Sequence, residues 1–216
     1  MKTVNPSLIP TVYVVDDDTS VRESLSSLIR SAGMLVEVFA SPLDFLALTS
    51  FSEFCCVVLD VRMPGLDGLA LQEKIVALGR EIPIIFITGH GDVPLAVRAM
   101  KAGAIDFLNK PFVDTDLLNA IAVALSRVSE TASERTELAN LRLRFNTLTP
   151  REKQIMFAVA QGKQNKGIAY ELCVTESTVK VHKHNVMTKM NLRSIAELTL
   201  AIQRLKNVGK QDVSRR

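Results

Sequence analysis

The sequence predicts an α/β protein with a doubly wound parallel sheet, followed by a smaller all-α domain. Along the first 128 residues, short apolar segments alternate with amphipathic helical patterns. Strict alternation of this kind is typical of a parallel sheet that helices cover on both faces. The C-terminal part is basic and shows only short helical patterns. Two domains with different partners are therefore expected.

The expected elements of the first domain follow one another as strand–helix units. Apolar segments with the length and composition of buried strands lie at residues 11–15, 35–39, 55–59, 83–88 and 104–108. The spacing and capping residues predict the helices between them. These cover Ser20 to Ser31, a segment opened by Ser41 and Pro42, about Gly68 to Leu78, a segment from near Asp92 with Pro94 just inside, and one from near Asp114.

Residues 129–147 predict a helical linker, because the stretch is charged, lacks Pro and Gly, and is rich in helix formers. Leu138, Leu141, Phe145 and Leu148 repeat at spacings of three, four and three. Such a run can form a short coiled-coil seam between two chains, or it can pack on its own domain. The pattern leaves both alternatives open.

Residues 148–208 predict a helical domain. Thr149, Pro150 and Glu152 form a capping-box signal for a helix that ends near Gly162. Further helices are expected over 166–172, over 176–190 after a capping Thr175, and over 196–205. Short helices joined by tight turns in a basic segment suggest a helix-turn-helix.

Composition narrows the function classes. The chain has 216 residues, 47% of them apolar, and a net charge of +3. Residues 149–216 hold 13 Lys and Arg against 5 Asp and Glu, a balance of +8, which leaves −5 for the rest. A basic domain suits a polyanion. No apolar stretch approaches the roughly 18–20 residues of a membrane span, so we expect a cytoplasmic protein with no membrane partner.

The cysteines and histidines predict no metal chemistry. Cys55, Cys56 and Cys173 form neither a CxxC pair nor a cluster with histidine, and are expected to be buried thiols in a reducing compartment. His182 and His184 are two residues apart on a predicted helix and point to different faces.

Polar residues follow the expected strands at their carboxyl ends. Asp60 follows the third strand, and Asp16, Asp17 and Asp18 follow the first. The carboxyl ends of parallel strands meet at one edge of a sheet, where ligands bind. Converging carboxylates repel one another unless a divalent cation joins them, and Mg²⁺ with retained waters suits this sparse set.

The fourth and fifth strands add a hydroxyl and an ammonium to that edge, from Thr88 and Lys110. Such a set can hold a phosphoryl group on Asp60, because Mg²⁺ and Lys110 neutralise its oxygens and Thr88 donates a hydrogen bond. The alternative for Asp60 alone is a turn residue that bonds its own backbone.

The stretches VYVVDDD, VVLDVRMPG, IIFITGHGD and KAGAIDFLNKPF resemble the receiver domain of two-component response regulators, a flavodoxin-like (βα)5 fold, over residues 10–128. The resemblance implies that a histidine kinase phosphorylates Asp60. It also implies Mg²⁺ ligation by Asp17, Asp60 and the Arg62 carbonyl oxygen, with Asp16 acting through water. It further implies a switch pair of Thr88 and Phe107, a phosphate ion pair from Lys110, and a cis bond before Pro111.

Phe107 also has a simpler interpretation as a core residue. By strand alternation, Ile105 and Phe107 are expected on one face of the sheet, so the switch role of Phe107 comes from the resemblance alone.

The stretch TESTVKVHKHNVMTKM, residues 175–190, has the character of a recognition helix. Polar residues crowd its first half, while Val179, Val186 and Met190 can face a core. The candidate DNA contacts in it are Thr178, Lys180, Val181, Lys183 and His184. Lys183 and Lys189 suit phosphates, and Asn165 and Lys166 can position the DNA backbone. The alternative is a solvated charged face.

The pieces LTPRE, NKGIA and TVKVH resemble the LuxR-type helix-turn-helix over about residues 148–205. That likeness implies base contacts by Lys180, Val181 and His184, and a fourth helix that supports dimerisation. Together the two halves resemble the FixJ/NarL family of response regulators. The implied dimer face of the receiver is its fourth helix and fifth strand, with Val97 and Lys101 as candidates.

The predicted function is therefore transcription control rather than enzymatic turnover. Phosphorylation of Asp60 by a cognate sensor histidine kinase is expected to promote a homodimer that binds double-stranded promoter DNA, with Mg²⁺ as cofactor and RNA polymerase as a further partner.

Two other functions fit parts of the sequence. An aspartyl-phosphate hydrolase would need a second Asp two positions after the acceptor, where this chain has Arg62. A phosphorylation-independent DNA-binding or scaffold protein would not need the full set of polar residues at the strand ends.

Overall fold

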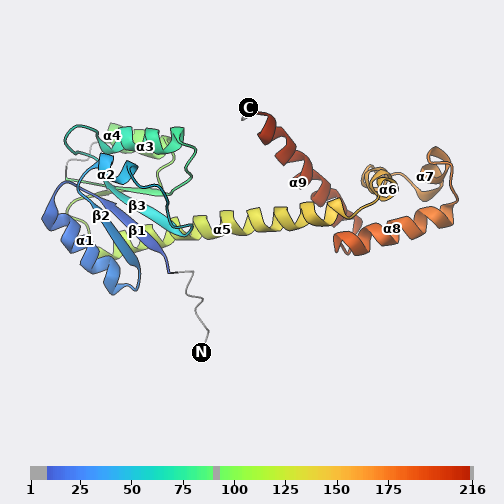
Figure 1. Cartoon of the computed structure of the whole chain (residues 1–216), viewed down its shortest axis with the longest axis horizontal. Helices are drawn as coiled ribbons and strands as arrows, with labels where there is room; N and C mark the ends of the chain where they lie inside the picture. Colours follow the sequence, from blue (N-terminus) through green and yellow to red (C-terminus); the bar gives the residue numbers. More distant parts are fainter. Residues whose placement is uncertain (1–8, 90–92, 215–216) are drawn as a thin grey trace. The chain divides into compact units, whose positions relative to one another are not determined.

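The computed structural model describes residues 9–89 and 93–214 and divides into two compact units, Met1–Thr131 and Ala132–Arg216 (Figure 1). The N-terminal unit contains β1 (Thr11–Val15), α1 (Thr19–Ser31), β2 (Leu35–Phe39), α2 (Pro42–Leu46), β3 (Cys55–Asp60), α3 (Gly68–Ala77), β4 (Ile84–Thr88), α4 (Val93–Lys101), β5 (Asp106–Asn109) and the first part of α5 (Asp114–Asn146). All five predicted strands form. The expected helix start near Asp92 lies outside the described residues.

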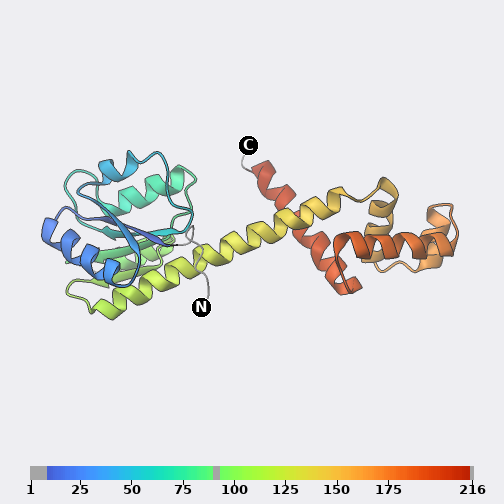
Figure 2. The ribbon, with the colours of Figure 1, turned by 60° about the horizontal axis from the view of Figure 1, so that its bottom comes forward.

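The strands form one parallel sheet in the order β2-β1-β3-β4-β5, which confirms the doubly wound fold. Helices α2, α3 and α4 pack on one face, over a core that contains Phe45, Leu71 and Phe86. Helices α1 and α5 pack on the other face, where Ile29 and Ile121 are buried. Both layers are visible in Figures 1 and 2.

Strand β5 differs from its prediction. It begins at Asp106, so Ile105 precedes it, and Ile105 and Phe107 pack against opposite faces of the sheet. The expectation that these two side chains share a face is therefore wrong. Side chains alternate between the two faces of a sheet only within a strand. The apolar residues before Asp106 gave no sign of where this strand begins.

The thiols separate into two groups. Cys55 and Cys56 are buried in β3, as expected, and burial raises the pKa of Cys55 to about 11. Cys173 is exposed, which corrects its predicted burial. It lies in the turn after α7 (Asn165–Glu171), with a positive φ of 52°.

The C-terminal unit continues with α6 (Pro150–Ala160), α7, α8 (Glu176–Met190) and α9 (Ile195–Ser214). The predicted capping box is confirmed, since the Thr149 N–H donates to Glu152 Oε2 at 2.8 Å and the Glu152 N–H to the Thr149 hydroxyl at 3.3 Å. Thr175 caps α8 as expected. Helix α9 runs beyond the predicted end at residue 205.

The predicted linker, residues 129–147, lies almost entirely within α5, which is continuous from Asp114 to Asn146. Leu141 and Phe145 pack against the core of the C-terminal unit, and Leu148 is buried in it. Packing on the same domain, the second alternative for this run, therefore accounts for these side chains.

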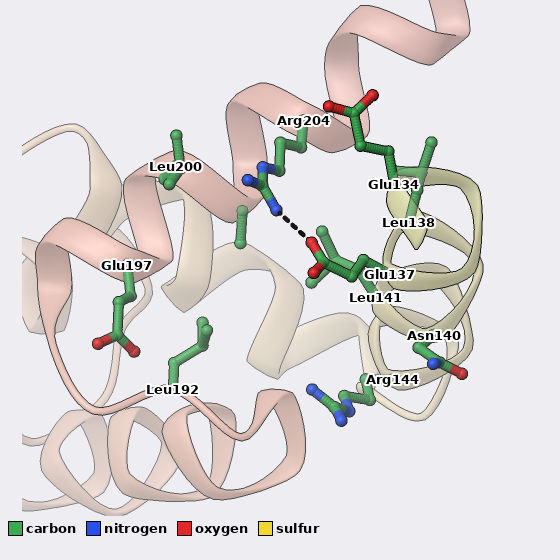
Figure 3. Close-up of a pocket in the computed structure, with 11 residues that line it drawn as sticks. Glu134, Glu137, Leu138, Asn140, Leu141, Arg144, Leu192, Glu197, Leu200 and Arg204 are labelled. Atoms are coloured by element: carbon green, nitrogen blue, oxygen red, sulfur yellow. Dashed lines mark hydrogen bonds and ion pairs between the residues drawn. The ribbon is translucent and has the colours of Figure 1, made fainter. Parts of the chain in front are cut away.

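A groove of about 580 Å³ lies between α5 and α9 within the C-terminal unit (Figure 3). Leu138 and Leu200 are among its apolar lining, and Arg204 donates to Glu137 across it at 3.3 Å. No helix in the described part of the chain is long and apolar enough to span a bilayer.

Candidate functional site

Sheet register brings the polar strand ends together. Val15 pairs with Leu59, so Asp16 follows β1 beside the position where β3 ends in Asp60. Thr88 pairs with Asn109, which places Lys110 directly after the end of β5. These residues come from distant parts of the sequence and meet at one edge of the sheet, as predicted.

Lys110 joins two buried carboxylates at this edge. Its Nζ lies 2.7 Å from Asp16 Oδ2 and 2.8 Å from Asp60 Oδ1. Asp16 and Asp60 are only 1% and 6% exposed. The other oxygen of Asp60 accepts the backbone N–H of Arg62 at 2.7 Å. Both oxygens of Asp60 therefore have a donor that fixes the orientation of the carboxylate.

The electrostatics of the pocket follow from burial. Burial raises the pKa of Asp60, and the hydrogen bond and charge of Lys110 oppose that shift without cancelling it. Burial by itself lowers the pKa of Lys110, but the hydrogen bonds and charges of Asp16 and Asp60 outweigh it and the net shift is upward. The single positive charge of Lys110 is therefore shared by two buried carboxylates, and one formal negative charge of this group remains uncompensated.

The other predicted pocket residues lie at or near the carboxyl ends of β3, β4 and β5. Thr88 is buried at the end of β4, and its carbonyl accepts the Lys110 N–H at 2.7 Å. The Lys110–Pro111 bond is cis, as the resemblance implied. Phe107 is half-buried, with its ring 6.2 Å from that of Phe86. Arg62 is exposed two residues after Asp60.

The acids after β1 have different surroundings. The Asp18 side chain caps α1 by accepting the Ser20 N–H at 2.8 Å, so Asp18 is a structural residue. Asp17 is exposed. Across residues 9–89 and 93–206, no three acidic, His or Cys side chains are grouped closely enough to hold a metal ion.

The donor set nevertheless fits a small hard cation. Two buried carboxylates share a single ammonium, so a second positive charge would be favourable there. Asp17 lies next along the chain to supply a further oxygen. Mg²⁺ binds through few protein oxygens and keeps several waters, so it does not need a closed cage of side chains.

Two residues that support the pocket were not predicted. Arg22 donates from Nη1 to the Asp16 carbonyl at 2.7 Å and from Nη2 to the Thr19 hydroxyl at 2.9 Å. Gly68 lies so close to the acceptor that a Cβ there would be 2.3 Å from the Asp60 carbonyl oxygen. The only signal for Gly68 was a glycine at the first position of a predicted helix.

The candidate DNA-contacting residues lie on α7 and α8. Val179, Val186 and Met190 are buried, as predicted, so the opposite side of α8 is exposed to solvent. Lys166, Lys180, Val181 and His184 are exposed, whereas Asn165, Thr178 and Lys183 are half-buried. Tyr170, on α7, is 87% exposed and was not predicted. It lies four positions after Lys166, which places both on one side of that helix.

Lys189, for which a phosphate contact was predicted, forms an ion pair within the C-terminal unit. Its Nζ lies 2.9 and 2.8 Å from the two carboxylate oxygens of Glu152, which is 3% exposed. Lys189 is therefore part of an ion pair that ties α8 to the start of α6. Charge alone could not reveal this, since the partner is 37 residues away.

The two candidates for a dimer face lie on the outside of α4. Val97 is 43% exposed and Lys101 is exposed, as their spacing predicted. Val93 and Met100 add further apolar exposure along this helix.

Comparisons with known proteins agree with this two-part arrangement. Residues 12–122 match the family described as response regulator receiver domain, and residues 146–202 match the family described as bacterial regulatory proteins, luxR family. The chain is 47% identical over 196 residues to response regulator protein TmoT of Ectopseudomonas mendocina, covering 91% of this chain and 89% of TmoT.

Two further likenesses extend over most of the chain. Transcriptional regulatory protein FixJ of Bradyrhizobium diazoefficiens is 44% identical over 187 residues, covering 87% of this chain and 91% of FixJ. The solved structure of the response regulator StyR matches with a TM-score of 0.76 and 49% identity, covering 90% of this chain and 98% of StyR.

Proposed function

This chain belongs to the two-component response regulators that carry a LuxR-type DNA-binding domain, and from that premise we propose that phosphorylation of Asp60 controls its binding to DNA. The phosphoryl donor is a cognate sensor histidine kinase. The modified chain forms a homodimer on double-stranded promoter DNA. The observation that carries this proposal is the buried Asp60 carboxylate, held by Lys110 beside Asp16 in a chain that also has an exposed basic recognition helix.

The chemistry at Asp60 is a phosphoryl transfer. A carboxylate oxygen of Asp60 forms a bond to phosphorus as the bond from phosphorus to the kinase histidine nitrogen breaks. Lys110 then pairs with the phosphoryl oxygens, and the Thr88 hydroxyl donates to one of them. The lysine already stands 2.8 Å from the acceptor, so little rearrangement is needed.

The expected cofactor is Mg²⁺, held by Asp17, Asp60 and the Arg62 carbonyl oxygen, with Asp16 acting through water. When bound, the ion offsets the negative charge that the carboxylates and the phosphoryl group bring together. The uncompensated charge of the Asp16–Asp60–Lys110 group supports this assignment.

Thr88 and Phe107 form the proposed switch, which alters the α4 and β5 surface around Val97 and Lys101. Phosphorylation needs only to shift an equilibrium between two conformations. On DNA, Lys180, Val181 and His184 contact bases, while Thr178, Lys183, Asn165 and Lys166 position the helix on the backbone. A cytoplasmic location and contact with RNA polymerase complete the proposal.

The test compares the full chain with Asp60→Asn. A duplex is first selected from a random DNA pool, and its binding and the sedimentation of the chain are measured with Mg²⁺ and acetyl phosphate. Wild type should dimerise and gain roughly 5- to 150-fold in DNA affinity, the usual range for coupled sites. Asp60→Asn should show neither change, and curves for Asp60→Asn that coincide with wild type would refute the proposal.

Asp67→Asn is the matched control. Asp67 is an exposed N-cap of α3 near the same edge of the sheet, and Asn caps a helix about as well. This variant loses the same charge as Asp60→Asn and should respond to acetyl phosphate like wild type.

A further inference from the structure

Gln72, on α3, is a buried polar residue bonded to the end of a neighbouring helix. It is 2% exposed, and its Nε2 lies 3.2 Å from the Ala102 carbonyl and 3.4 Å from the Ala99 carbonyl, at the C-terminal end of α4. Its Oε1 is buried with no hydrogen-bond partner in the described part of the chain. An apolar side chain would avoid that orphaned oxygen, so stability alone does not explain a glutamine here.

The same face of α3 begins against the phosphoacceptor. Gly68 is four residues before Gln72, which places the two on one side of the helix. A Cβ on Gly68 would come within 2.3 Å of the Asp60 carbonyl, and the Gly68 N–H donates to the Val61 carbonyl at 2.9 Å. Helix α3 therefore touches the backbone of Asp60 at one point and α4 one turn later.

Gln72 supplies hydrogen bonds at the C-terminal end of α4. The Ala99 carbonyl already accepts the Ala104 N–H at 3.1 Å, whereas the amide of Gln72 supplies a donor for the carbonyl of Ala102, just past the helix. The last carbonyls of a helix need such outside donors. Gln72 thus holds the C-terminal end of the helix that presents Val97 and Met100 to solvent.

We infer that Gln72 is a positioning residue that couples the Asp60 end of α3 to α4. A displacement of the Asp60 backbone moves the start of α3, and the directional hydrogen bond from Gln72 passes that movement to the end of α4. This inference rests on the proposed function, in which α4 belongs to the dimer face. It adds a connection through α3 that is separate from Thr88 and Phe107.

The test uses the full chain with Gln72→Leu and Gln72→Glu. Leucine fills the space without a donor, and glutamate keeps the shape but turns an oxygen toward the carbonyls. Beryllofluoride with Mg²⁺ serves as the phosphoryl mimic. Its affinity is measured by ¹⁹F NMR on dilute protein, and dimerisation by sedimentation.

Both variants should bind beryllofluoride at least as tightly as wild type, because binding no longer has to move α4. The gain in dimerisation that beryllofluoride produces should fall by about 2- to 30-fold, the range for residues that carry coupling. A gain equal to that of wild type would overturn the inference. A parallel loss of beryllofluoride affinity would also overturn it, since Gln72 would then only support the fold.

Ile29→Val controls for a general loss of stability. Ile29 is fully buried on α1, on the opposite face of the sheet from α3 and α4. Ile29→Val should lower the melting temperature but keep the wild-type gain in dimerisation on beryllofluoride binding. If it reduced that gain as much as the Gln72 variants do, the inference about Gln72 would be overturned. No response to beryllofluoride in wild type itself would instead refute the proposed function.

Discussion

At the scale of single residues, the backbone restricts Asp60, the proposed phosphoacceptor, as much as charge does. Asp60 is held through both carboxylate oxygens, by Lys110 and by the Arg62 N–H. Gly68 restricts the backbone of Asp60, because the absence of a side chain at Gly68 allows α3 to start against the Asp60 carbonyl. The Asp60 side chain therefore has little freedom, which would favour a defined attack geometry in the proposed phosphoryl transfer.

Gly68→Ala should lower the free energy of unfolding of the N-terminal unit by about 1–3 kcal/mol, because the new Cβ meets a backbone oxygen that cannot move cheaply. Gly167→Ala is the control, since nothing lies within 4 Å of its Cβ position. That change should be neutral or stabilising by about 0.4–1 kcal/mol. Denaturant unfolding of both variants measures the difference, and equal effects would contradict the predicted clash.

The Glu152–Lys189 pair predicts an acid-sensitive contribution to stability. The hydrogen bonds from Lys189 hold the pKa of Glu152 below its ordinary value, against the effect of burial. A carboxyl with a lower pKa in the folded state stabilises the fold above its unfolded pKa of about 4.3. That contribution is lost as the pH falls through the lower, folded value.

Lys189→Met should therefore destabilise the C-terminal unit at pH 7 by about 1–3 kcal/mol, the cost of leaving a buried group without its partner. The gap to wild type should narrow as the pH falls below about 4, where the carboxyl of the unfolded chain is protonated. Denaturant unfolding between pH 7 and pH 3 tests this. A gap that stays constant over that range would show that the ion pair contributes nothing.

At the scale of elements, the buried side of α8 determines which of its residues are exposed and so available for the proposed DNA contacts. Val179 and Val186 are in the core, so Lys180 and Val181 are turned outward and Lys183 lies at the margin. The predicted roles differ in their thermodynamic signature. A base contact discriminates between sequences, whereas a phosphate contact contributes equally to every sequence and depends on salt.

Lys180→Gln should weaken binding to the selected duplex by about 1–3 kcal/mol and relax its sequence preference at one position. Lys183→Gln should weaken binding to the selected and scrambled duplexes alike. It should also reduce the slope of log affinity against log salt concentration by about 0.9. Titrations of both duplexes over a salt series distinguish the two variants. Identical behaviour would mean that the helix does not enter the groove as proposed.

Local patterns predicted the elements well, and long-range side-chain contacts poorly. Thr149 and Thr175 mark helix starts because a cap acts within one turn. The meeting of Asp60 and Lys110 was also predictable, because parallel strand ends share an edge. Neither the bond from Gln72 to α4 nor the pair of Lys189 with Glu152 has a local signature. Such contacts depend on helix packing that periodicity does not specify.

At the scale of the whole molecule, the chain is two folding units of opposite charge. Residues 132–216 hold 16 Lys and Arg against 7 Asp and Glu, a balance of +9, and residues 1–131 hold 10 against 16, a balance of −6. The N-terminal unit has cores on both faces of its sheet, and the C-terminal unit has a core of its own. The division between them, after Thr131, falls inside α5. The second half of α5 is therefore structurally part of the C-terminal unit rather than a spacer.

This division predicts how fragments behave. A fragment of residues 132–216 should fold alone, and should be more stable than one of residues 148–216 by about 1.5–3 kcal/mol, because only the longer one keeps the half-buried Leu141 and Phe145. Phe145 also packs on Phe157, with ring centroids 6.3 Å apart, and Lys153 lies over its ring at 4.6 Å. Denaturant unfolding compares the two fragments. Phe145→Ala in the longer fragment is an internal check, because it should lower the stability of that fragment by much of the difference. Equal stabilities would mean that this part of α5 only connects the two units and does not stabilise the C-terminal one.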